Sequence, residues 1–131
     1  MDFREIMKYA MREYMDDLRT TLSGLSEKER RYQPDKESHH IDFVVWHMAR
    51  VEDAHLHRMI QNKEQIWIRA GWDKHLGMKG EGTGFGYTAE DVITLPKFDM
   101  NQMLEYYDAV RAEVFNFIDN LSSSDLDVEL D

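Results

Sequence analysis

Apolar residues recur at intervals of three and four positions in three stretches of the chain, which is the spacing of one face of an α-helix. The first stretch runs from Phe3 to near Gly24. The second starts at about Ser38, a good N-cap, and continues through residues 41–61, and the third follows Asp99. No stretch alternates with a period of two, and no hairpin signature occurs. The pattern predicts an all-α protein with three long helices.

Shorter helical turns and one long loop are expected between these helices. Ser26 and Thr88 each begin a capping-box sequence, and a proline limits the helix that follows each of them. The segment QIWIRAGW reads as a short helix, and six of the seven glycines follow within residues 71–86. Long loops in compact domains are often functional, so this one is either a rim or lid of a site or a plain surface connection. The acidic segment after residue 121 reads as a loop or as the start of a further element.

Residues 1–131 are expected to form one domain, because the length is close to that of a typical single domain. Three amphipathic helices with broad apolar faces predict an antiparallel helical bundle. Faces of this width suit a four-helix core better than a three-helix core. The sequence therefore indicates that a fourth helix is missing.

Charge and composition restrict the classes of function. The formal net charge is -10, and all of this excess lies in residues 81–131, which carry 2 basic and 12 acidic residues. Such a charge repels phosphate backbones and anionic membranes, so neither nucleic acid nor membrane is an expected partner. No secretory signal or membrane span is recognisable, and a cytoplasmic location is expected. Because cysteine is absent, any thiol chemistry would need an external thiol.

Histidines are concentrated in the second helical stretch, which contains five of the six, at positions 39, 40, 47, 55 and 57. No two of them have the i,i+4 spacing that brings two imidazoles together on one helix face, so one helix cannot supply a complete metal site. Glu52 and His55 have the E-x-x-H spacing of di-metal carboxylate bundles, but matching partners are missing. A polar contact, either with a residue four positions away or with another helix, is the preferred interpretation of Glu52.

Three tryptophans could line a substrate pocket, because indole offers a large apolar surface with one hydrogen-bond donor. Trp67 and Trp72 are the candidates beside the glycine-rich loop. Packing in the core or anchoring of the loop is the alternative role for both. No nucleotide-binding or hydrolase signature occurs.

An ordered series of features gives the chain its resemblance to a known family. These are a Q-P pair at residues 33–34, the run WHMARVED at residues 46–53, the W-x-x-x-x-W pair before LGM, and GFGYTAED at residues 84–91. Together they resemble the DinB-like superfamily, also called the YfiT-like family of metal-dependent enzymes.

The resemblance implies a four-helix bundle that holds a divalent metal, such as zinc or nickel, through three histidines. One histidine lies on the second helix, where His47 matches by position, and the other two belong to an HxxxH on the fourth helix. The resemblance also implies a small-molecule substrate and a low-molecular-weight thiol cosubstrate, used by a transferase or an isomerase, while other members are described as hydrolases. A metal would favour the thiolate form of such a thiol.

The sequence departs from this pattern at its C-terminal end. It stops at Asp131, where the family continues into the fourth helix, and it contains no HxxxH. An uncovered apolar groove predicts a truncated sequence, a homodimer that fills the groove, or aggregation, and truncation is the preferred interpretation. The competing hypothesis is a non-catalytic helical binding or dimerisation module that has lost the metal site.

Overall fold

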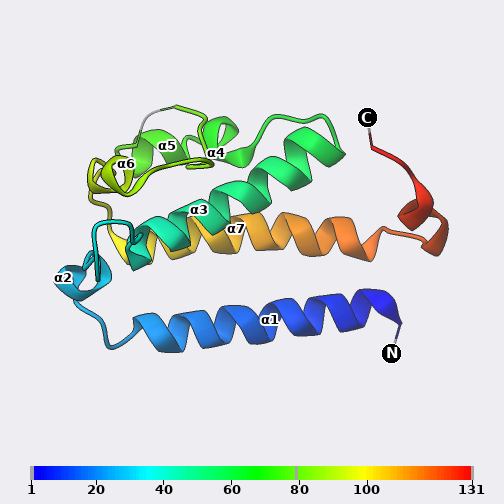
Figure 1. Cartoon of the computed structure of the whole chain (residues 1–131). Coiled ribbons are helices and arrows are strands. Elements are labelled where there is room, and N and C mark those ends of the chain that lie inside the picture. Colours follow the sequence, from blue (N-terminus) through cyan, green and yellow to red (C-terminus); the bar gives the residue numbers. More distant parts are fainter. Residues whose placement is uncertain (1, 79, 131) are drawn as a thin grey trace.

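The computed structural model describes residues 2–78 and 80–130. The regular secondary structure of these residues is helical, with no strand among them. Three long helices dominate (Figure 1): α1 (Phe3–Leu22), α3 (Ile41–Asp53) and α7 (Met100–Asp119). A π-helical segment, η1 (Ala54–Ile60), extends α3. The prediction of an all-α bundle with three long helices is confirmed. Helix α1 runs antiparallel to α3 and α7, which run in the same direction.

Polar side chains define where the long helices begin. Asp2 accepts from the backbone N–H groups of the first turn of α1, and Asp99 accepts from the N–H of Gln102 at 3.0 Å. The N-cap of α3 is His40, whose Nδ1 accepts from the N–H of Phe43 at 2.9 Å, and not Ser38 as the sequence predicted. The imidazole nitrogen accepts a hydrogen bond from a free backbone N–H of the first turn, as a serine hydroxyl would. The His40 side chain is buried.

Short helical turns connect the long helices. They are α2 (Glu27–Arg30), α4 (Ile66–Arg69), α5 (Trp72–His75), α6 (Ala89–Ile93) and the 3-10 turn η2 (Ser123–Asp127). The capping boxes predicted at Ser26 and Thr88 are both present. Between α5 and α6, residues 76–78 and 80–88 have no regular secondary structure, as the glycines there predicted.

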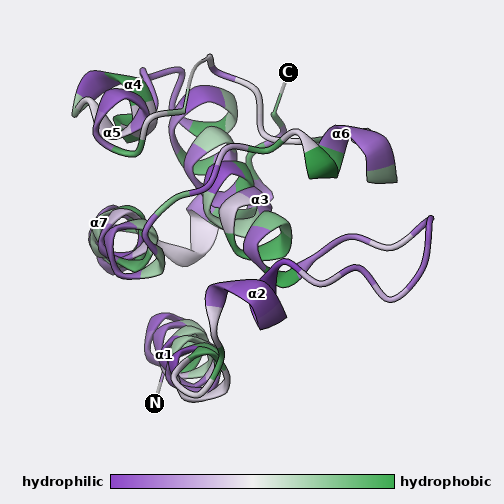
Figure 2. Ribbon diagram, turned by 90° about the vertical axis from the view of Figure 1, so that its left-hand side faces the viewer, coloured by the Kyte–Doolittle hydropathy of each residue, from purple (hydrophilic) through white to green (hydrophobic). Residues whose placement is uncertain are grey.

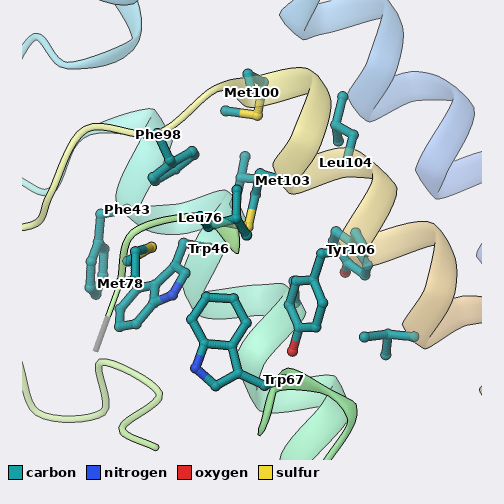
Figure 3. Close-up of a cluster of buried hydrophobic side chains, with 14 of the residues drawn as sticks. Phe43, Trp46, Trp67, Leu76, Met78, Phe98, Met100, Met103, Leu104 and Tyr106 are labelled. Atoms are coloured by element: carbon teal, nitrogen blue, oxygen red, sulfur yellow. The ribbon is translucent and has the colours of Figure 1, made fainter. Parts of the chain in front are cut away.

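Aromatic, methionine and aliphatic side chains from α3, α7 and the connecting segments form most of the core (Figure 3), and α1 adds Met15 and Leu22. Trp67 is 1% exposed, and the rings of Trp67 and Tyr106 pack with their centroids 4.9 Å apart. Helix α3 turns one buried face to this core and carries a second apolar face that is not buried there. On that second face Ile41 and Val44 are 37% and 42% exposed.

Viewed along the bundle, α1, α7 and α3 occupy three corners (Figure 2), with α7 between the other two. Ion pairs of Lys8 with Asp119 and of Arg19 with Asp108 join α1 to α7. The fourth corner lies between α1 and α3, where no further long helix is present among the described residues and only the short α2 is seen in this view. This arrangement leaves the second apolar face of α3 open.

None of the helices in residues 2–78 and 80–130 combines the length and the apolar character needed to cross a bilayer.

Candidate functional site

A groove of about 410 Å³ lies at the open corner of the bundle, and its lining is mainly apolar. Seven side chains from α1, α3, η1 and α7 form it: Tyr14, His47, Met48, Val51, Glu52, His55 and Tyr107. Five of them follow one another at helical spacing along α3 and η1. This set is called the groove below. It contains the histidine that the sequence marked as a metal ligand.

His47 is held in one orientation by its surroundings. Its Nδ1 lies 2.6 Å from the carbonyl oxygen of Thr83, and its ring stacks on Phe43 with the centroids 5.4 Å apart. Because a carbonyl oxygen only accepts hydrogen bonds, the neutral ring carries its hydrogen on Nδ1 and its lone pair on Nε2. Histidines that bind metals commonly have their second ring nitrogen tied to a carbonyl in this way.

The carbonyl that holds His47 belongs to a segment that lies along α3, residues 80–87, called the strap below. Three more carbonyl oxygens of the strap contact side-chain nitrogen atoms. The oxygen of Gly80 accepts from Trp67 Nε1 at 3.0 Å, and that of Glu81 accepts from Arg50 Nη2 at 2.8 Å. The oxygen of Tyr87 lies 3.2 Å from His39 Nε2. Side chains therefore fix the strap on both sides of Thr83.

Glu52 forms an inter-helix polar contact, one of the two kinds of contact that its sequence position suggested. Both of its oxygens accept from Arg111 Nε on α7, at 3.0 and 2.8 Å. Burial raises the pKa of Glu52, and Arg111 opposes that rise. Arg111 also donates to the carbonyl of Met11 at 2.7 Å, so one guanidinium joins all three long helices. Of this pair, only Glu52 lines the groove.

Tyr107 and His55 are two further polar side chains that line the groove. Burial raises the pKa of Tyr107 to about 12, and the nearby carboxylate of Glu52 contributes to the rise. His55 is exposed, and its Nδ1 lies 2.8 Å from the carbonyl of Val51 in the preceding turn. In His55, as in His47, Nδ1 makes the contact with a backbone carbonyl, and Nε2 points away from that carbonyl.

A buried polar network lies beneath the strap, on the opposite side of α3 from the groove. Asp53 is fully buried and accepts from the backbone N–H groups of Ile66 and Trp67 at 3.1 and 2.9 Å. Its Oδ1 also lies 2.7 Å from His57 Nδ1. This carboxylate fixes the start of α4 against α3, and the arrangement is structural.

His57 bridges two carboxylates at the end of α3. Its Nε2 lies 2.8 Å from Glu113 on α7, and Glu113 also pairs with Arg69 at 2.9 Å. These side chains border a cavity of about 470 Å³ with a mixed polar lining. Within residues 2–78 and 80–130, however, no three His, Asp or Glu side chains come together in a group that could hold a metal ion.

The two tryptophans suggested as pocket residues do not line the groove. Trp67 is buried and holds the strap through its indole nitrogen, while Trp72 is half-buried against Tyr106. These positions favour the packing and loop-anchoring roles weighed beside the pocket role. The sequence did not single out Thr83, because a backbone acceptor leaves no residue-type signal.

Comparison with known proteins identifies relatives by family and by fold. The family model of the DinB superfamily matches residues 10–131. A crystal structure described as the conserved protein of locus from Enterococcus faecalis superimposes with a TM-score of 0.81 at 16% sequence identity. The match covers 95% of this chain and 74% of that one, and at this identity the likeness concerns the fold alone. No curated protein matches the chain.

Proposed function

We propose that this chain, which belongs to the DinB superfamily, is a divalent-metal-dependent enzyme in which His47 supplies one metal ligand. The observation that carries the proposal is the contact of His47 Nδ1 with the Thr83 carbonyl. It leaves Nε2 as the nitrogen with a free lone pair and holds the ring against Phe43. A neutral imidazole with its other nitrogen tied down is the form that binds metals.

His47 fits the donor chemistry of zinc or nickel, but it is a single ligand. The described residues bring no three His, Asp or Glu side chains together around a metal. A catalytic zinc site takes three protein ligands, so the proposal requires further donors from a helix seated in the groove. The open apolar face of α3 beside His47 provides the surface for such a helix.

The proposed substrate is a small molecule that reacts with a low-molecular-weight thiol, in a transfer or an isomerisation. A bound divalent metal supplies charge that favours thiolate over thiol at neutral pH. The chain has no cysteine, so the thiol would come from outside it. Both oxygens of Glu52 are occupied by Arg111, and the proposal accordingly gives Glu52 a structural role.

The test is the metal content of the protein expressed from its own gene, measured by mass spectrometry after purification without chelators. We expect about one divalent ion per chain, lost in His47→Ala and retained in His55→Ala. His55 is the matched control because it lines the same groove with its Nδ1 held by a carbonyl. A wild-type protein without metal, or a His47→Ala variant that keeps its metal, would overturn the proposal.

The second candidate function is a non-catalytic helical module that pairs with a second copy through the groove. The exposed apolar side chains of α1 and α3, among them Met7, Tyr14 and Val44, favour it. In that case Val44→Glu should convert a dimer into a monomer in light scattering, whereas Ile93→Glu, an exposed change on α6, should not. A wild-type monomer at high concentration would contradict this candidate.

A further inference from the structure

We infer that Gly84 is a positioning residue for His47, because the missing side chain at Gly84 lets the strap lie close enough to α3 for Thr83 to fix the His47 tautomer. The functional meaning of the inference rests on the proposed role of His47 as a metal ligand. The structural claim concerns the protein without metal.

Gly84 is buried and packs directly against two aromatic rings of α3. A Cβ at this position would lie 2.6 Å from Trp46 Cζ3 and 2.8 Å from Phe43 Cε2, closer than atoms of this kind approach. Phe43 and Trp46 are 2% and 4% exposed, so neither ring has free space to move into. Its φ of +85° is a further conformation that favours glycine. Any side chain here must lift the strap or displace the rings.

Either movement would disturb His47. Gly84 follows Thr83 directly, so lifting the strap carries away the carbonyl that accepts from Nδ1. Displacing Phe43 removes the ring on which His47 stacks, with an angle of 8° between the planes. The hydrogen bond and the stacking contact of the His47 ring therefore both depend on Gly84. Anchors at Glu81 and Tyr87 hold the strap on both sides, which confines the disturbance to its middle.

Another glycine of the strap provides a matched control. Gly86 has a φ of +79°, close to that of Gly84, but a Cβ there would meet nothing within 4 Å. Gly86→Ala therefore carries the same kind of backbone strain without the contact with α3. Val110→Ala is a second control, because it removes buried volume from α7 and lowers stability without changing the strap.

The experiment is 15N NMR of the imidazole groups in the metal-free protein, which distinguishes a hydrogen on Nδ1 from one on Nε2. The wild type, Gly86→Ala and Val110→Ala should all show His47 protonated on Nδ1. In Gly84→Ala the ratio of the Nδ1–H form to the Nε2–H form should fall about tenfold, the factor that one net hydrogen bond contributes.

Retention of the wild-type ratio in Gly84→Ala would overturn the inference, and so would an equal loss in either control. If Gly84→Ala does not fold, adding Trp46→Phe removes Cζ3, the nearer of the two ring atoms, and leaves the contact with Phe43, so this double variant should still show a lower ratio than Trp46→Phe alone. An unchanged ratio in that variant would then refute the inference. Because no metal is present, the result does not depend on whether His47 binds one, and the metal-content experiment can fail independently.

Discussion

The hydroxyl of Tyr106 on α7 donates to Oδ2 of Asp53 on α3 across 2.6 Å, with both side chains fully buried. The phenol joins two helices that run side by side in the same direction. Arg50 approaches the same region and donates to the Tyr106 hydroxyl at 3.2 Å. Burial and the charge of Asp53 raise the pKa of Tyr106, so the hydroxyl keeps its hydrogen for this bond. A hydrogen-bonded polar network therefore lies inside the core, in which Arg50 Nε is the one polar side-chain atom of these three residues without a partner.

We expect Asp53→Ala to lower the free energy of unfolding by about 3 kcal/mol or more. The change leaves buried donors of Trp67, Tyr106 and His57 without their acceptor. Urea denaturation followed by circular dichroism measures the loss. Asp16→Ala, an exposed change on α1, serves as the control and should change stability by less than about 0.5 kcal/mol. Similar losses in the two variants would contradict the structural role of Asp53.

Arg111 should matter mainly because it neutralises Glu52. Arg111→Met removes the only cation that contacts this carboxylate among the described residues, and we expect a loss of about 2 kcal/mol at pH 7. Adding Glu52→Gln removes the unpaired charge, so the double variant should be more stable than Arg111→Met alone. A double-mutant cycle by denaturant unfolding measures this coupling. Additive effects would show that the two side chains do not interact.

Tyr107 should make the protein sensitive to alkali. Its pKa in the folded protein is raised to about 12, above the ordinary 10.0, so the folded state holds the phenolic proton more tightly than the unfolded state. The stabilisation is complete below pH 10 and is lost as the pH rises toward 12. Unfolding measured across this range should be less pH-dependent in Tyr107→Phe than in the wild type. Tyr32→Phe, at an exposed position, should retain the wild-type dependence.

The sequence predicted the parts of the fold that depend on local signals. The capping residues Ser26, Thr88 and Asp99 and the glycine-rich loop lie where their residue types indicated. The start of α3 was placed two residues early because Ser38 is the commoner type of cap, while His40 caps through a ring nitrogen. The apolar periodicity of α3 indicated helix but could not show which of its two apolar faces is buried. Val44 and Val45 are both apolar, yet only Val45 is buried.

The candidate site was predictable only in part. The resemblance marked His47 as a candidate ligand, and the structure places His47 in the groove. Neither the strap nor the His47 contact was predicted, because both depend on a backbone carbonyl 36 residues away in sequence. Arg50 was likewise not singled out, since nothing in the pattern reveals that this charged residue is fully buried. Such contacts arise from tertiary packing, which residue periodicity does not encode.

The π-helical segment η1 contains the buried His57, and its wider turns hold more residues than those of an α-helix. A π-helical turn contains about one residue more than an α-helical turn, so deletion of one residue such as Ala54 could restore ordinary pitch without breaking the helix. Because the deletion removes the extra residue of the wider turn, His57 would keep its approximate direction and its contact with Glu113 at Nε2. A shortened form of this segment would therefore keep both the outline of the bundle and the contact of His57 with Glu113 that joins η1 to α7.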